Sequence, residues 1–419
     1  MTDTITIVVV FAFLLSLHSW LTLYVTLYAR FDASYKKSVR RPESRLVPKA
    51  TFTVLIPCRH EEKVISETIE RLARVTYPKN LTEIIVLCTP DDMATIEAAE
   101  STIKRLKMKH ARVVMFDPPA GKPRALNIGL RLAKHKYIAV FDAEDDVGLE
   151  VFSAVDSIVS DPSVDVVQGG VRLINHTSRW YGIHNAVEYF LWYKHKMHYF
   201  NQVGVVPLGG NTVFFKKSAL KEISGWDEAI LTEDADVGIR LSAAMKNVRI
   251  LYDPSQNTNE ETPNSLGTFI RQRTRWSQGF LQIIAGKKIH ELRTAKQKLL
   301  VYFLLTSPMF IATSLLASAA LGVYLAASSV SAVALLPMLT PLILVLLIIW
   351  VNCVGLHEYG QEQKEKIKLS TYMFFIITFL PYQALLSFAA IRAMARHTIG
   401  LSNWEKTPHQ GLHRMRKRS

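Results

Sequence analysis

The segment AILTEDADVGIRL, residues 229–241, crowds three carboxylates, Glu233, Asp234 and Asp236, into four positions beside apolar neighbours. One interpretation is structural: Thr232 caps a helix, and the acids occupy its first turn, where the helix macrodipole favours negative charge. The other is chemical: Asp234 is a general base at the mouth of a pocket. A helix N-terminus tends to keep a carboxyl pKa low, so neighbouring carboxylates would have to raise that of Asp234.

A second acidic cluster, VFDAEDD, ends a predicted strand. Asp142 and Glu144 stand at alternate positions, from which a turn can bring both carboxylates onto one cation. Hard oxygen ligands suit Mg²⁺ or Mn²⁺, and such an ion neutralises charge that develops on a departing diphosphate. The alternative is a solvated acidic turn after an edge strand.

Two basic segments could serve an anionic substrate. GKPRALNIG offers Lys122 and Arg124, which can hold phosphate oxygens or can be surface charges at a helix start. RQRTRWSQGF places Gln272, Arg275 and Trp276 within about one helical turn. Its three arginines could instead be cations at a membrane surface, with the tryptophan as an interfacial residue.

The elements that must position these residues form an α/β domain over residues 50–260. Short β-rich runs alternate with amphipathic helical stretches, which predicts a mostly parallel sheet. Ligands of such sheets bind beyond the carboxyl ends of the strands. The polar clusters PCRHEE, TPDD and DAEDD all stand at strand ends, so we expect one functional edge. The predicted strands are 52–57, 82–88 and 136–145, and the predicted helices are 61–75 and 123–135.

Apolar segments flank this domain and are long enough to cross the ~30 Å core of a bilayer. Residues 1–30 read as an uncleaved signal anchor, because no basic region precedes the apolar run and no small-residue cleavage site follows it. Basic residues come directly after it, which places the domain in the cytoplasm. Residues 261–297 are predicted to lie at the interface, 298–397 to form a C-terminal membrane region, and 398–419 to be a basic cytoplasmic tail.

The number of spans conflicts with that orientation. One anchor followed by three further spans would place the basic tail outside, whereas the positive-inside rule favours the cytoplasm. We therefore expect one proline-containing segment, near Pro308 or Pro381, to be re-entrant or interfacial.

Composition narrows the class of partner. The 419 residues carry 50 Lys and Arg against 36 Asp and Glu, a net charge of +14. These basic residues gather at the membrane flanks rather than in one groove, which favours a lipid bilayer and argues against nucleic acid. The cysteines Cys58, Cys88 and Cys353 have neither metal-ligand spacing nor the number for a disulfide framework, so we expect free thiols in a reducing compartment.

One ordered set of motifs joins these observations. A strand followed by P-x-x-x-E-E, then DD, GKPRALN, DAED, LGGN, GWDE, TEDAD and Q-x-x-R-W occur in that order. Over residues 50–285 this set resembles the membrane-integrated family-2 glycosyltransferases, in the branch of the cellulose, hyaluronan and poly-N-acetylglucosamine synthases. The resemblance implies a GT-A nucleotide-sugar-binding fold and a nucleotide diphosphate sugar donor, a uridine nucleotide being favoured over guanosine.

The resemblance also implies roles for particular residues. In place of the family's D-x-D motif the chain has Asp142-Ala143-Glu144, so either Glu144 or Asp145 would join Asp142 at the Mg²⁺ or Mn²⁺ ion. Asp234 would be the general base. The residues that would bind the nucleotide are Arg59, Glu61, Asp92, Lys122 and Asp142. The residues that would contact the acceptor and the diphosphate are Gly209, Gly210, Asn211, Glu233, Gln272, Arg275 and Trp276.

The implied reaction is a single in-line displacement that inverts the anomeric centre and forms a β-glycosidic bond. The Q-x-x-R-W motif favours a processive polysaccharide synthase with a glycan acceptor. The alternatives are one-step transfer to a lipid acceptor, such as a polyprenyl phosphate or a glycolipid, and a catalytically silent nucleotide-sugar-binding subunit. The family's usual setting is a bacterial or archaeal plasma membrane, which the chain would cross several times with its catalytic domain in the cytoplasm.

Overall fold

The computed structural model describes residues 2–35, 47–119, 121–327 and 332–401. Its centre is a seven-stranded sheet in the order β3-β2-β1-β4-β7-β5-β8. All neighbours pair in parallel except β7, which runs antiparallel to β4 and β5. The expected mostly parallel α/β sheet is therefore confirmed. The strands are β1 (Phe52–Pro57), β2 (Thr82–Cys88), β3 (Ala111–Met115), β4 (Tyr137–Val140), β5 (Val166–Gly169), β7 (Val213–Lys216) and β8 (Val248–Leu251).

Both faces of the sheet are covered by helices, which explains the nearly continuous apolar sequence of the central strands. Successive side chains of β1 point to opposite faces, so Leu55 enters one core while Val54 and Ile56 enter the other. The core of Leu55 includes side chains of α5 (Lys122–Leu132). The opposite core contains α3 (Ile65–Ala73), α4 (Met93–Arg105) and α6 (Val151–Ile158).

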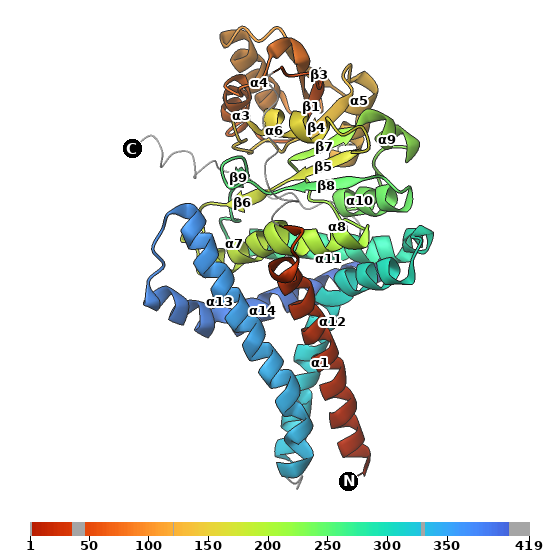
Figure 1. Cartoon of the computed structure of the whole chain (residues 1–419), viewed down its shortest axis with the longest axis vertical. Helices are drawn as coiled ribbons and strands as arrows, with labels where there is room; N and C mark the ends of the chain where they lie inside the picture. The colour runs from red at the N-terminus through yellow and green to blue at the C-terminus, as the bar shows by residue number, and fades with distance from the viewer. Residues whose placement is uncertain (1, 36–46, 120, 328–331, 402–419) are drawn as a thin grey trace.

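A layer of helices lies across the molecule below this domain (Figure 1). It contains α7 (Gly182–Leu191), a π-helical turn η2 (Trp192–Lys196) that continues into α8 (Met197–Val203), and α11 (Leu266–Ala285). The two-stranded sheet of β6 (Val171–Leu173) and β9 (Thr258–Glu260) lies near this layer. The remaining elements are η1 (Lys79–Leu81), α9 (Lys217–Glu222), α10 (Glu233–Ala243), η3 (Lys288–Glu291) and η4 (Ala332–Met338).

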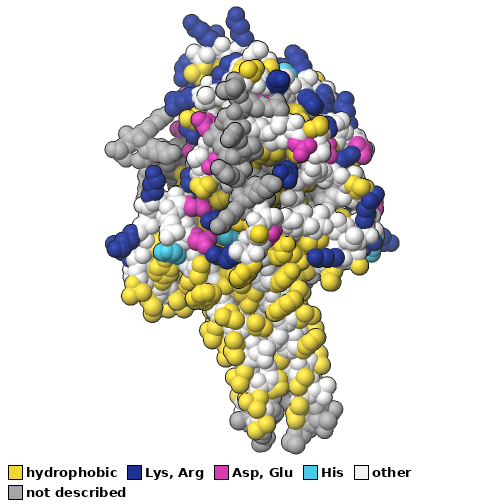
Figure 2. Space-filling model, in the orientation of Figure 1, with side chains coloured by type: hydrophobic (Ala, Val, Ile, Leu, Met, Phe, Trp, Pro, Cys, Tyr) yellow, Lys and Arg dark blue, Asp and Glu magenta, His cyan; other side chains and the backbone are white. Residues whose placement is uncertain are grey.

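Three long helices, α1 (Thr2–Phe31), α12 (Ala295–Ala326) and α13 (Leu339–Gln363), extend away from the transverse layer (Figure 1). Figure 2 shows their shafts covered by hydrophobic side chains, while the Lys and Arg side chains lie over the α/β domain. By length and composition these three helices and α14 (Leu369–Thr398) could each cross a membrane. Exposed apolar side chains on the three shafts include Phe13, Leu17, Trp20, Leu316, Val323, Leu346 and Trp350.

Helix α14 is placed differently from the other three. It lies crosswise and packs along α11 (Figure 1). Pro381 lies inside α14 without ending it, and Phe379 and Tyr382 are buried while Ile377 and Leu380 are exposed. An apolar helix with one face on protein and one exposed face suits an interfacial position. The predicted basic tail falls almost entirely on residues 402–419, outside the described residues.

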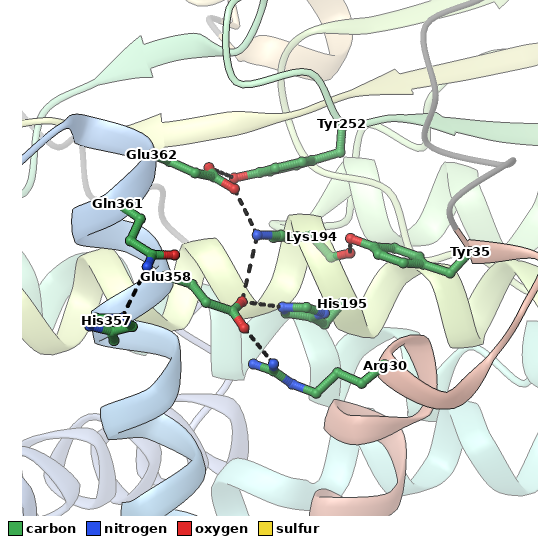
Figure 3. A network of polar contacts seen from close by, with 9 residues as sticks. All are labelled: Arg30, Tyr35, Lys194, His195, Tyr252, His357, Glu358, Gln361 and Glu362. Carbon is green, nitrogen blue, oxygen red and sulfur yellow. Dashed lines mark hydrogen bonds and ion pairs between the residues drawn. The ribbon is translucent and has the colours of Figure 1, made fainter.

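A cluster of charged side chains joins α1, η2 and α13 where they meet, and we call it the ion network (Figure 3). Glu358 of α13 accepts a hydrogen bond from Arg30 of α1 and lies 3.1 Å from His195 Nε2. Lys194 Nζ lies 2.7 Å from Glu362 Oε1 and 3.5 Å from Glu358 Oε2. The network fixes the shafts against the transverse layer.

Candidate active site

A cavity of about 500 Å³ opens where the strand ends meet the transverse helices. The residues at the carboxyl ends of three parallel strands line it: Pro57 after β1, Thr89 after β2 and Asp142 after β4. The expected functional edge is therefore present. Most of the residues predicted for the site line this cavity: Arg59, Glu61, Lys122, Asp142, Glu144, Gly209, Gly210, Asn211, Glu233, Asp234, Gln272, Arg275 and Trp276.

Lys122 connects the two acidic clusters. Its Nζ donates to Asp142 Oδ1 at 2.5 Å and to the Gly210 carbonyl at 2.8 Å, and lies 3.9 Å from Glu233 Oε1. Burial works to lower the pKa of Lys122, but Asp142 and Glu233 outweigh it and raise that pKa. Lys122 is therefore a fixed cation at the centre of the site.

Gly210 brings its backbone close to this cation and to the predicted base. A Cβ added there would lie 3.1 Å from Asp234 Oδ2 and 3.3 Å from Lys122 Nζ, tighter than ordinary side-chain contacts. Gly209 beside it approaches Tyr193, whose Oη would lie 2.2 Å from an added Cβ. Two glycines are needed here because the loop passes directly beneath the reactive groups.

The carboxylates of α10 are poised to accept protons. Burial raises the pKa of Glu233 to about 7, with Lys122 opposing and Asp234 adding to the rise. Burial also raises the pKa of Asp234, again against Lys122. We expected neighbouring carboxylates to raise it, but desolvation is the larger cause. Thr232 stands at the helix start without a side-chain capping bond, so the capping interpretation was wrong for its hydroxyl.

The turn after β4 presents two carboxylates to the cavity. Asp142 and Glu144 line the wall, whereas the buried Asp145 does not. Asp145 Oδ2 accepts from the Asp142 amide at 2.8 Å, and its Oδ1 accepts from Asn211 at 3.0 Å. Asp145 therefore shapes the turn, which favours Glu144 as the second carboxylate of the pair.

This donor set fits a hard divalent cation that arrives with a diphosphate. Among the described residues, no three His, Cys, Asp or Glu side chains form a closed metal cage. Mg²⁺ does not need one, since it commonly takes one or two carboxylates and completes its shell with phosphate oxygens and water. Asp142 and Glu144 could provide those two carboxylates.

Asp92 lies outside the described cavity wall. It is buried at the start of α4, and its Oδ2 accepts from the His60 amide at 2.5 Å. Its neighbour Asp91 is exposed and lies 3.5 Å from Arg59 Nη2. Asp92 thus holds the backbone of the turn after β1, and its assignment to base recognition stays a prediction.

Helix α11 carries the Q-x-x-R-W residues into the cavity. Gln272 Oε1 and Arg275 Nε are buried and have no hydrogen-bond partner among the described residues. Arg273 instead forms two hydrogen bonds with Glu188, at 2.6 and 2.9 Å, and is buried. The interpretation of these arginines as membrane-surface cations was therefore wrong for Arg273. Arg275 and Arg271 are both partly exposed, and Arg275 lines the cavity.

Sequence reasoning missed the contribution of the segment 182–203. It forms α7, η2 and α8 and supplies Glu188, Tyr189, Tyr193 and Lys196 to the cavity wall. A charged residue at each end of an aromatic run, VEYFLWYKHK, was the available signal. Glu260 was also missed: it lines the cavity and accepts a hydrogen bond from Asn211.

The GT-A-like sheet, the strand-end carboxylates and the membrane-side helices define a glycosyltransferase with flanking apolar helices. Residues 48–279 match the family described as "Glycosyltransferase like family 2", and the chain belongs to this family.

Relatives fall in the same family. A probable glycosyltransferase of Bacillus subtilis, YdaM, is 26% identical over 283 residues, 66% of this chain and 64% of its own length. Poly-beta-1,6-N-acetyl-D-glucosamine synthases of Staphylococcus aureus are 26% identical over 274 residues, 65% of each chain. The matched part thus spans slightly less than two thirds of these relatives.

A solved structure of similar fold is the mannosyltransferase PcManGT from Pyrobaculum calidifontis, in complex with GDP-Man and Mn²⁺. Its TM-score is 0.60 at 18% identity, and the alignment covers 93% of this chain and 99% of that one. The likeness shows that the fold is shared.

Proposed function

We propose that this protein is an inverting glycosyltransferase that moves a sugar from a nucleotide diphosphate donor to an acceptor hydroxyl at the membrane face. One observation carries the proposal: Asp234, Lys122 and Asp142 come from three separate elements and line one cavity. A buried carboxylate of raised pKa beside a fixed cation suits a base that works next to a leaving diphosphate.

In the proposed mechanism Asp234 removes the proton of the acceptor hydroxyl. The oxygen forms a bond to the anomeric carbon from the face opposite the diphosphate, while the bond from that carbon to the diphosphate oxygen breaks. Lys122 and Arg275 stabilise the negative charge on the departing nucleotide diphosphate. Asp142 and Glu144 would hold Mg²⁺ or Mn²⁺, which when bound neutralises part of that charge. Because one displacement occurs, an α-linked donor yields a β-linked product.

The proposed donor is a nucleotide diphosphate sugar, with a uridine nucleotide favoured. Similarity to synthases named for a poly-N-acetylglucosamine product supports an N-acetylglucosamine donor, and the GDP-Man complex of a protein of like fold keeps guanosine in the screen. Extension of a β-linked glycan is the favoured product. One-step transfer to a lipid is the second candidate, favoured by apolar residues of α1 and α12 in the cavity wall.

We also propose an orientation. With α1, α12 and α13 as spans and α14 at the interface, the catalytic domain and the chain beyond α14 both lie in the cytoplasm. This arrangement satisfies the positive-inside rule. A cysteine placed at the exposed Gly400 should react with a membrane-impermeant maleimide only after the cytoplasmic side is opened, and labelling of intact cells would contradict it.

The function is tested with the purified full-length protein and a panel of nucleotide sugars, in Mg²⁺, Mn²⁺ or a chelator. We expect metal-dependent release of one nucleotide diphosphate and a ladder of β-linked products from labelled donor. A single lipid-linked sugar would establish the one-step candidate. Saturable nucleotide binding with neither hydrolysis nor transfer would contradict the enzyme and support a silent subunit.

A further inference from the structure

Residues of α1 and α12 form one part of the cavity wall, which we call the arm. His18 and Val25 of α1 line it, as do Leu304 and Ile311 of α12. At a rise of 1.5 Å per residue, Ile311 lies about 24 Å along α12 from its first residue, Ala295. The arm therefore extends along the part of these helices that is apolar enough to lie in a membrane.

The wall of this arm suits a hydrocarbon chain. Its described lining is mainly apolar. Two polar groups there, His18 Nε2 and Ser307 Oγ, form a hydrogen bond with each other at 3.1 Å. Hydrocarbon tails need such a surface, whereas a free sugar or nucleotide needs many polar partners. The apolar residues of the arm are Val25, Phe200, Phe280, Phe303, Leu304, Pro308 and Ile311.

Lys196 lines the cavity at the end of η2 and is not neutralised by the chain. No described side chain forms an ion pair or a hydrogen bond with its ammonium group. The carboxylate with which it interacts electrostatically, Glu188, already accepts two hydrogen bonds from Arg273 and one from Tyr382 at 2.7 Å. The charges of Glu188 and Arg273 cancel each other, so the positive charge of Lys196 has no counter-charge among the described residues beside the apolar arm.

An uncompensated cation in such surroundings is unfavourable unless a ligand brings the opposite charge. Burial lowers the pKa of Lys196, and Glu188 opposes this only in part. His18 is the other titratable group that interacts with Lys196, and it cannot supply negative charge. A bound anion is what this position lacks.

We propose that Lys196 binds the phosphate of a lipid-linked sugar acceptor, whose hydrocarbon tail lies in the arm between α1 and α12. The proposal rests on the proposed function, since the acceptor's sugar hydroxyl is the group that Asp234 deprotonates. The phosphate marks the junction between tail and sugar, so Lys196 and the arm together select the acceptor and leave donor binding to the polar half of the cavity.

Binding measurements separate this proposal from the reaction itself. Dissociation constants are measured for the full-length protein in detergent with farnesyl phosphate, farnesol and inorganic phosphate, and in parallel with UDP and GDP as reporters of the donor half. Lys196→Gln removes the charge and Lys196→Arg keeps it. The matched control is Lys296→Gln, which removes an exposed lysine that does not line the cavity. Leu304→Trp narrows the arm.

We expect the wild type to bind farnesyl phosphate more tightly than farnesol or inorganic phosphate. Lys196→Gln should weaken farnesyl phosphate at least about tenfold, the usual size of a charged hydrogen bond, while Lys196→Arg and Lys296→Gln stay near wild type. Leu304→Trp should weaken both farnesyl compounds. Nucleotide binding should be unchanged throughout, which also shows that each variant is folded.

Several results would overturn the proposal. If farnesol binds as tightly as farnesyl phosphate, the protein has no phosphate-binding site in the arm. If inorganic phosphate binds as tightly as farnesyl phosphate, the hydrocarbon tail does not contribute to binding. Unchanged farnesyl phosphate binding in Lys196→Gln would exclude this lysine. If Lys196→Gln loses nucleotide binding, that loss indicates a misfolded variant, and the test passes to Leu304→Trp. If Leu304→Trp binds farnesyl phosphate with wild-type affinity, the arm is excluded as the site of the lipid tail. A wild type that binds neither nucleotide refutes the proposed function instead.

Discussion

The cavity and the ion network contain the same kinds of side chain in opposite states. In the ion network each carboxylate meets cations or donors from other elements: Glu358 meets Arg30 and His195, and Glu362 meets Lys194 and Tyr252. Figure 3 shows these groups pointing at one another from α1, η2, α13 and the segment that follows β8. In the cavity, Gln272 and Arg275 carry buried atoms without partners among the described residues, and Lys196 is left unneutralised.

The difference separates structural charge from functional charge. Polar groups that the fold fully pairs hold elements together, and removing one partner leaves the other group unsatisfied. Polar groups that the fold leaves unpaired reduce stability and persist where a ligand completes them. Substitutions of the unpaired cavity groups should therefore affect activity without stability, and substitutions of paired groups, in the ion network or at Arg273, should affect stability.

The largest effect is expected from Asp234→Asn. The amide cannot accept the acceptor's proton, so transfer should fall by about 10² to 10⁴-fold, the usual contribution of a general base. The nucleotide affinity should be unchanged and the thermal midpoint should not fall, because the substitution keeps the side chain's shape and removes a partly buried charge whose ionisation is unfavourable. Transfer at the wild-type rate would contradict the assignment, and Glu222→Gln, at an exposed ion pair with Lys246, serves as the control.

Arg275 and Arg273 lie on the same helix, α11, and allow an unpaired group and a paired group to be compared directly. Arg275→Gln should lower transfer by about 10²-fold, typical for loss of a charge that stabilises a leaving group, with little change in stability. Arg273→Gln should instead lower the unfolding free energy by about 2–3 kcal/mol, because it leaves Glu188 without its cation. This is below the range for a fully buried pair, since Glu188 lines the cavity.

Both variants are measured by transfer rate per folded molecule and by thermal unfolding in detergent. Loss of stability in Arg275→Gln with none in Arg273→Gln would reverse the assignments and remove the distinction between the two arginines.

The ion network should respond to Glu358→Gln with a loss of about 1–3 kcal/mol. This value lies between those for exposed and buried pairs because both Arg30 and Glu358 are partly exposed. Transfer per folded molecule should stay at the wild-type value, since none of these residues lines the cavity. An unchanged thermal midpoint, or a slower enzyme at full stability, would show that the network does not serve as a structural connection.

The sequence predicted β1, β2 and β4 from buried apolar runs, although β4 ends at Val140, before the predicted end at residue 145. β3 was missed because ARVVM is only partly buried. β5, β7 and β8 were not predicted, and each has only four residues. The antiparallel insertion of β7 between β4 and β5 depends on long-range pairing that no local pattern records.

The site followed the same rule. Residues at strand ends and helix starts, such as Asp142 and Asp234, could be found because the geometry of parallel sheets brings such positions together. Glu188, Lys196 and Glu260 were missed, because they reach the cavity only when the transverse helices pack beneath the sheet. The positions of Asp145 and Asp92, turned toward backbone and amide partners, also depend on side-chain directions that spacing does not reveal.

The smallest effect, a shift in pH dependence, tests whether the cavity carboxylates differ from ordinary ones. The base must be ionised, so kcat/KM should fall as the pH falls through the pKa of Asp234, which burial raises above the ~3.9 of a free aspartate. Glu233, with its pKa of about 7, titrates together with Asp234, so Glu233→Gln should move this acid limb to lower pH while Glu222→Gln leaves it in place. Stability should change in the opposite sense: carboxyls of raised native pKa bind protons more tightly when folded, so the unfolding free energy should decline as the pH rises through the same range. An acid limb that Glu233→Gln does not move, or stability that rises with activity, would show that these acids are as well paired as those of the ion network.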